Sequence, residues 1–153
     1  MEHLKDLASN ERYWLMLAVT HILLADGGVE DTEKTYLKAL IKTIFSEDIK
    51  VVFSEISELF RSKKLPSLEK IQVPDLENVI FMLDVLARSV FVNGKKPESQ
   101  TSKYFEAGKA LGIHIGTLSY RLSLEAEKFR VDRKLEQVRK DIKEDRQRTM
   151  PVN

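Results

Sequence analysis

The chain has no cysteine among its 153 residues. This absence excludes a disulfide framework, a thiolate metal site and a cysteine nucleophile, and it is compatible with a reducing compartment. Long apolar runs are also lacking, because none approaches the about 20 residues that a helix needs to cross a bilayer. The polar N-terminal stretch MEHLKDLASNER does not resemble a signal peptide. Together these absences predict a soluble, cytoplasmic protein.

Neither sign of charge is in clear excess. The 25 basic and 24 acidic side chains leave a formal net charge of +1. Such a balance provides no global attraction to nucleic acid or to anionic lipid, so we expect no nucleic-acid partner. The charges are unevenly distributed, however, because residues 121–148 carry ten Lys or Arg against seven Asp or Glu. A mildly acidic body and a mildly basic C-terminal segment are therefore expected.

Glycine is scarce, but two of the six glycines stand together at Gly27-Gly28. Apolar residues recur at helical spacing before them, over 15–23, and after them, over 37–44. Glycine supplies the positive φ that a sharp reversal after a helix needs, and Asp26 can hydrogen-bond back onto the turn. The pattern predicts a tight antiparallel helical hairpin over residues 15–45.

A second copy of this hairpin follows 67 residues downstream. Placing Asp26-Gly27 on Asn93-Gly94 also aligns apolar positions of the two segments. Asn or Asp followed by Gly reverses a chain at low cost, so the shared turn strengthens the match. We expect two related helical hairpins that share one core. The aligned pairs are Leu15 with Met82, Met16 with Leu83, Val19 with Leu86, Leu37 with Tyr104, Leu40 with Ala107, and Ile44 with Leu111.

The periodicity predicts an all-α, single-domain helical bundle with a long C-terminal helix. Ser9 or Asn10 is the expected N-cap of the first helix, Asp75 caps a later one, and Gly112 ends the next. A short helix at 67–71 fits within the connector between two prolines. The predicted organisation is a helical domain over 1–120 and a charged helical extension over 121–153. The expected helices cover 11–25, 30–45, 46–60, 75–90, 98–111 and 117–146.

Four carboxylates surround the first turn: Asp26, Glu30, Asp31 and Glu33. Acidic residues in the first turn of a helix interact favourably with its dipole, which gives them a purely structural explanation. Oxygen ligands gathered on a loop are also what calcium or magnesium prefers, so a weak divalent-cation site is the functional alternative. The second turn carries Lys95 and Lys96 instead, and we expect no second site there.

The C-terminal helix carries Val131, Leu135, Val138 and Ile142 at 4-3-4 spacing. This narrow apolar stripe can fold back on the body or pair with another copy as a short coiled coil. A homodimer formed through this helix, or an adaptor role in which the helix recruits a protein partner, is therefore a candidate function.

An enzyme is the other class of function, with His21 or His114 as the base beside a carboxylate. No second histidine, serine elbow or phosphate-binding loop stands at a spacing that supports catalysis. His21 lies among apolar residues of the first helix, where a packed or hydrogen-bonded histidine is the simpler interpretation. We therefore expect a protein that is not an enzyme.

The first hairpin, LAVTHILLADGGVEDTEKTYLKAL, resembles the hallmark segment of the tellurite-resistance TerB-like family. The matching positions are Ala25, Asp26, Gly27, Val29, Glu33 and Leu37, and the stretch Ala110-Leu111-Gly112-Ile113 resembles the second half of that fold. The resemblance covers about residues 11–115. Here Asn93-Gly94-Lys95-Lys96 departs from the acidic pattern of the family.

This resemblance implies an all-helical domain of about seven helices without enzymatic activity. It further implies a role in tellurite resistance or stress response, divalent-cation binding by an acidic surface, and protein partners in membrane-associated complexes. The chain lacks the His-Pro-Asp tripeptide of a J-domain, so a direct co-chaperone role is not expected.

Overall fold

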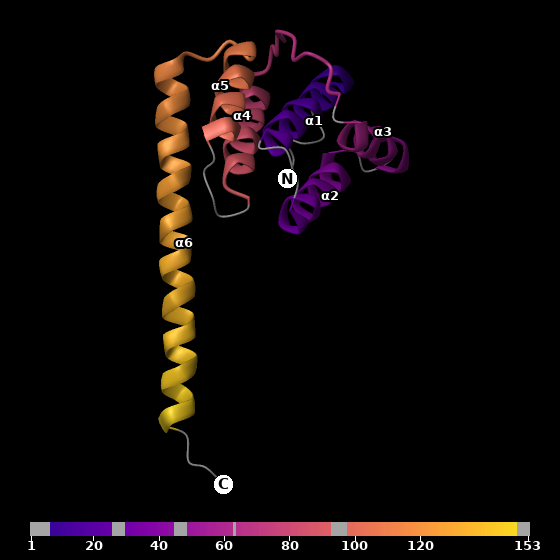
Figure 1. Ribbon diagram of the computed structural model, residues 1–153. Helices are drawn as coiled ribbons and strands as arrows, with labels where there is room; N and C mark the ends of the chain where they lie inside the picture. Colours follow the sequence, from indigo (N-terminus) through magenta and orange to yellow (C-terminus); the bar gives the residue numbers. More distant parts are fainter. Residues whose placement is uncertain (1–6, 26–29, 45–48, 63, 93–97, 150–153) are drawn as a thin grey trace.

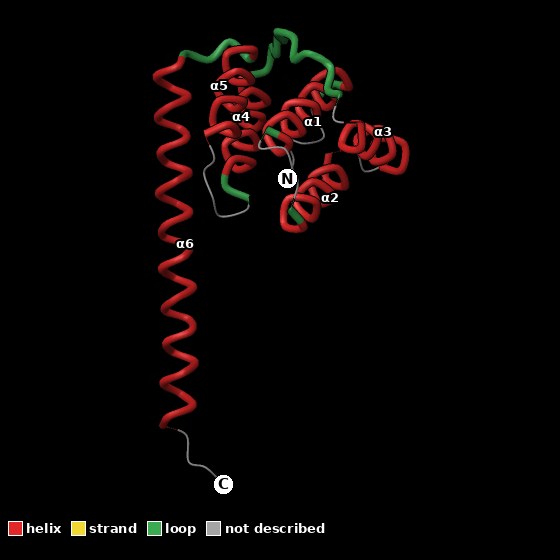
Figure 2. The backbone as a smooth tube through the Cα atoms, in the orientation of Figure 1, coloured by secondary structure: helices red, strands yellow, loops and turns green. Residues whose placement is uncertain are grey.

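The computed structural model describes residues 7–25, 30–44, 49–62, 64–92 and 98–149, without the side chains of 44, 49–53 and 60. All regular structure in these residues is α-helical (Figures 1 and 2), which confirms the predicted all-α bundle with a long C-terminal helix. The described part contains six helices rather than seven, because the connector 64–75 forms no helix at 67–71. The helices are α1 (Ser9–Leu24), α2 (Asp31–Ile44), α3 (Ile49–Ser62), α4 (Leu76–Val90), α5 (Glu98–Ala110) and α6 (Ile115–Thr149).

The helix boundaries confirm the internal repeat. α4 begins 67 residues after α1, and α5 begins 67 residues after α2. α3 and α6 occupy the third place in each half, although α6 is far longer. The predicted turn residues Asp26, Gly27, Asn93 and Gly94 lie outside the described residues.

The aligned apolar positions form one core between the two halves. Leu15 and Met82 are both fully buried, and so are Val19 and Leu86. Each helix thus turns the face that the repeat predicts towards the shared interior. The core is completed by the aligned residues Leu37 and Tyr104 and by α6 residues Leu118 and Leu122.

Two buried hydrogen bonds join equivalent positions of the two halves. The amide of Asn78 donates to the carboxylate of Glu11 at 3.5 Å, and the amide of Gln100 donates to Glu33 at 3.1 Å. In both pairs the residues are 67 apart and each is the third residue of its helix. The two halves therefore bring corresponding positions into contact with each other in the interior.

The two halves differ in the packing of their helices. α1 packs along α5, whereas a cavity of about 160 Å³ opens between the equivalent pair, α2 and α4. The hydroxyl of Tyr36 reaches across from α2 to the backbone oxygen of Val85, at 3.4 Å. α2 and α3 lie on the side of the body away from α6 (Figure 1).

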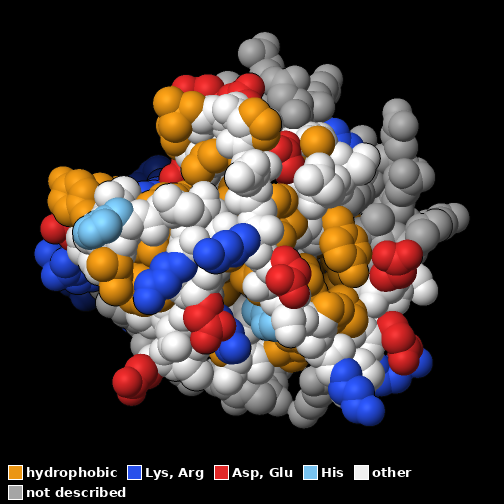
Figure 3. Space-filling model, turned by 90° about the horizontal axis from the view of Figure 1, so that it is seen from above, with side chains coloured by type: hydrophobic (Ala, Val, Ile, Leu, Met, Phe, Trp, Pro, Cys, Tyr) orange, Lys and Arg blue, Asp and Glu red, His pale blue; other side chains and the backbone are white. Residues whose placement is uncertain are grey.

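The connector 64–75 is tied to the body by hydrogen bonds instead of helical structure. The indole of Trp14 donates to the backbone oxygen of Glu69 at 2.8 Å, and the amide of Ile71 donates to Ala110 at 3.1 Å. These bonds satisfy backbone groups that a non-helical segment would otherwise leave unpaired. Figure 3 views the molecule from the connector side, where basic and acidic side chains are interspersed without a large patch of one sign.

Helix ends follow the predictions in part. Asp75 caps α4 by accepting hydrogen bonds from the amides of Glu77 and Asn78. The prediction for α1 was wrong, because its N-cap is Ala8 and the side chain of Glu11 accepts from the Ala8 amide at 2.9 Å. Beyond α5, Gly112 adopts φ of 84°. The amide of Ile113 then bonds to Gly108, which is the glycine-ended termination expected there.

No helix in the described segments combines the length and apolar character that crossing a bilayer requires.

Candidate functional site

The first part of α6 is docked firmly on the body. Leu118 and Leu122 are buried in the core. The buried hydroxyl of Tyr104, on α5, donates to the backbone oxygen of Leu118 at 2.9 Å. α5 and α6 approach so closely at Gly108 that a Cβ atom there would lie 2.2 Å from a methyl group of Leu118. A larger residue at this crossing would therefore require the Leu118 side chain to move.

An ionic cluster adds to this docking. The guanidinium of Arg121 contacts Asp84 of α4 at 2.9 Å and Glu125 of α6 at 3.0 Å. Burial by itself lowers the pKa of Arg121, but the hydrogen bonds to the two carboxylates outweigh it and raise the pKa above its ordinary value. Because Arg121 is partly buried, its two ion pairs contribute more to stability than fully exposed surface ion pairs do.

The docked part of α6 ends near Phe129. The ring of Phe129 packs against that of Phe91 with 5.9 Å between centroids, and the guanidinium of Arg133 lies over the Phe129 ring at 5.6 Å from its centroid. From residue 130 to Thr149 every residue is exposed. We call residues 130–149 the arm. Figure 1 shows the arm projecting well beyond the rest of the molecule.

The arm carries an unpartnered apolar stripe. The exposed fractions of Val131, Leu135, Val138 and Ile142 are 53%, 52%, 50% and 54%. At about 100° per residue, this stripe lies about 150° around the helix from Leu118, Leu122 and Phe129, which face the body. The alternative in which the stripe folds back on the body is therefore not what the structure adopts. The stripe is available for contact with another protein.

The predicted acidic site is only partly described. Glu30 and Asp31 are exposed, whereas Glu33 is 1% exposed. One oxygen of Glu33 accepts the Glu30 amide at 3.0 Å and the other accepts Gln100. Asp26 lies outside the described residues, and among those that are described no three His, Asp or Glu side chains gather as a metal would require. The four-residue cation site stays a prediction.

The two histidines considered as bases have structural contacts. A ring nitrogen of His21 lies 2.8 Å from the backbone oxygen of Pro66, so this nitrogen carries the proton and donates. His114 accepts the Gly116 amide at 3.0 Å, next to the start of α6. These contacts give both residues a structural role, His21 at the connector and His114 at the start of α6.

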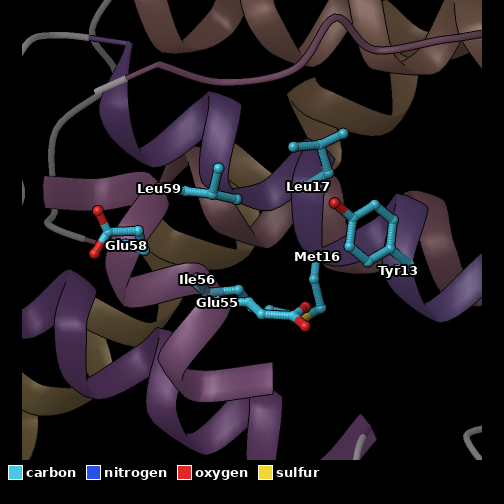
Figure 4. Close-up of a pocket in the computed structure, with 7 residues that line it drawn as sticks. All are labelled: Tyr13, Met16, Leu17, Glu55, Ile56, Glu58 and Leu59. Carbon is cyan, nitrogen blue, oxygen red and sulfur yellow. The ribbon is translucent and has the colours of Figure 1, made fainter. Parts of the chain in front are cut away.

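A cavity of about 420 Å³ opens between α1 and α3 (Figure 4). Met16, Leu17, Ile56 and Leu59 give it apolar walls. Tyr13 and two exposed glutamates, Glu55 and Glu58, stand with them. The arrangement can hold an apolar side chain that is flanked by a positive charge.

Sequence reasoning missed the polar pairs that join the halves, although a signal was present. The same 67-residue offset that aligns the apolar positions also aligns Glu11 with Asn78 and Glu33 with Gln100. Each pair sets a carboxylate against an amide, which is a complementary pair of hydrogen-bonding groups. A search of the aligned repeat for complementary polar residues would have found both.

No family model matches this chain, and no curated protein or solved structure matches it either.

Proposed function

We propose that this protein is a non-catalytic interaction module, in which a helical body presents the arm of α6 to a protein partner. The observation that carries the proposal is the exposed apolar stripe of Val131, Leu135, Val138 and Ile142, which projects past the docked part of the helix. An apolar stripe with 4-3-4 spacing on an otherwise charged helix is the surface that pairs with another helix.

The dimerisation or adaptor function is thus the one that the geometry favours. A role for the acidic turn in binding calcium, magnesium or a basic partner is a separate proposal that depends on Asp26, Glu30, Asp31 and Glu33. A link to tellurite resistance or stress response, together with a cytoplasmic location, depends on the resemblance of residues 11–115 to TerB-like proteins and on composition. The stripe does not depend on that resemblance.

The test compares the full chain with a variant that carries Leu135→Gln and Ile142→Gln. Glutamine keeps the helix propensity of the arm while removing its apolar contact. We expect the variant to lose the associations of the parent chain, measured by sedimentation velocity of the purified protein and by quantitative co-purification from its native cell. Its unfolding transition should be unchanged, since both side chains are exposed.

The matched control is Glu136→Gln with Lys143→Gln, at two positions of the arm that lie outside the stripe. This control changes two exposed residues and leaves the net charge and the stripe intact, so it should associate as the parent does. If the stripe variant keeps every association of the parent chain, the proposed function is wrong.

A further inference from the structure

The charges that flank the stripe indicate what covers it. In heptad terms Val131 and Val138 occupy d positions, while Leu135 and Ile142 occupy a positions. We call this row of a and d positions the seam. The a position that precedes the stripe is Lys128, and the d position that follows it is Asp145. Both are exposed, and they lie equally far from the centre of the seam between Leu135 and Val138.

The orientation of a partner helix decides whether these two charges attract or repel. In a parallel pair of identical helices, Lys128 would meet the partner's Lys128 and Asp145 would meet the partner's Asp145 within the seam. In an antiparallel pair with Leu135 opposite the partner's Val138, Lys128 meets the partner's Asp145 at both ends. Buried like charges are costly, so the antiparallel orientation is favoured.

The g positions give the same answer independently. They are Glu127, Lys134, Asp141 and Arg148, which alternate in sign. Antiparallel helices bring g against g, so that Lys134 faces the partner's Asp141 and Glu127 faces the partner's Arg148. A parallel pair would instead bring g against e, which sets Lys134 against the partner's Arg139.

The charges also fix the register. Sliding the antiparallel pair by one heptad in one direction brings Lys134 against the partner's Lys134. Sliding it in the other direction brings Asp141 against the partner's Asp141. Of these three registers, only the one centred between Leu135 and Val138 makes the pairs of g positions complementary, and it also has a longer overlap than registers displaced by two heptads. Flanking charges of this kind set partner and orientation in coiled coils.

The body leaves room for this arrangement. The overlap would run over residues 124–149, about 39 Å at 1.5 Å per residue. Leu124, at 41% exposed, extends the apolar seam towards the body. Because the stripe faces about 150° away from the docked face of α6, the partner helix lies along the far side of α6 and the two bodies sit at opposite ends.

We propose that two copies of this chain pair through residues 124–149 as an antiparallel coiled coil, with Leu135 of each copy opposite Val138 of the other. This rests on the proposed function of the arm as an interaction surface, and it identifies the partner as a second copy. A different helical protein on the same stripe is the competing outcome.

Charge reversal of the full chain tests the orientation. Lys134→Glu would place like charges at two symmetry-related contacts with Asp141 in the antiparallel dimer, so we expect its dissociation constant to rise about tenfold. Adding Asp141→Lys to that variant should restore the parent affinity. Sedimentation equilibrium measures both. In a parallel dimer Lys134→Glu would strengthen association, because it would face the partner's Arg139, and that result would overturn the proposal.

Thiol cross-linking provides a second measurement, because the chain has no cysteine of its own. Leu124→Cys and Thr149→Cys chains should form disulfides when mixed and should form none when each is oxidised alone. Lys140→Cys, on the opposite face, is the matched control and should not cross-link. Cross-linking of like with like, or equal yields from the control, would contradict the antiparallel register.

The outcomes separate this proposal from the proposed function. If the purified chain stays monomeric at about 100 µM, pairing with a second copy is wrong. If the stripe variant then still loses a co-purifying protein that the parent retains, the arm remains an interaction surface. If it loses nothing, both proposals fall.

Discussion

Glu33 has a structural role that its place in the sequence suggested only in part. An acidic residue in the first turn of α2 was expected from the helix dipole, and the structure shows its carboxylate accepting the Glu30 amide. Its second partner, Gln100, comes from the other half of the chain. That contact depends on how the halves pack, so local sequence rules could not supply it.

Removing the amide of Gln100 should therefore destabilise the fold. Gln100→Leu preserves most of the side-chain volume but leaves the buried Glu33 carboxylate with one hydrogen bond fewer. We expect the free energy of unfolding to fall by about 1–3 kcal/mol, measured by urea denaturation. Gln72→Leu, at an exposed position of the connector, is the control and should change stability little. Equal effects of the two substitutions would contradict a role for this pair.

Tyr104 makes stability depend on alkaline pH. Burial raises the pKa of its hydroxyl from 10.0 to about 12. The unfolded chain therefore releases the tyrosine proton at a lower pH than the folded chain, so stability is retained below pH 10 and lost as the pH rises towards 12. Tyr104→Phe should weaken the fold at neutral pH by about 1 kcal/mol, through loss of the bond to Leu118, but should flatten this alkaline decline.

Urea denaturation at several pH values from 8 to 11.5 measures the slope. Tyr120→Phe, at a residue that is 67% exposed, should leave the slope of the parent chain unchanged. An identical decline in Tyr104→Phe and the parent would show that another group is responsible.

The local sequence predicts where the helices lie. It does not predict which part of α6 packs on the body and which part projects from it. Its start at Ile115 and end at Thr149 lie within a few residues of the expected 117–146. The same periodicity allowed the stripe to face the body or a partner. Contacts of Gly108, Leu118 and Phe129 decide between these two orientations. They hold the docked face of α6 against the body, so the stripe points outwards.

Gly108→Ala tests this docking. The added methyl group would collide with the buried Leu118 side chain, which must leave its present position, so the free energy of unfolding should fall by about 1–3 kcal/mol. In a chain that also carries Leu118→Ala, the space exists and the same substitution should cost less. A double-mutant cycle measured by thermal denaturation gives this coupling. Purely additive costs would mean that the close approach does not limit the packing.

At the scale of the whole molecule, stability is unevenly distributed along α6. Residues up to Phe129 pack on the core, while the arm has only its own helical hydrogen bonds and the contacts of its neighbours along the helix. Most of the stability of helices in proteins comes from tertiary packing, which the arm lacks. The arm should be the first part of the helix to open.

Amide hydrogen exchange checks this expectation. In dilute solution, amides of 134–149 should exchange faster than those of 118–129, and α1 provides the fully protected reference. Raising the protein concentration should slow exchange in the arm alone if copies pair through it. Uniform protection along α6 at all concentrations would contradict the division into a docked part and an arm.

The sequence by itself determined the all-helical architecture, the 67-residue repeat and the apolar faces, because helical periodicity and helix capping act over a few neighbouring residues. Only the tertiary structure decided that Glu33 meets Gln100, that the connector 64–75 stays non-helical against α1 and α5, and that the stripe on α6 points away from the core. Those outcomes depend on which surfaces fit together over long sequence separations. Steric fit at a residue such as Gly108 is visible only when both helices are in place.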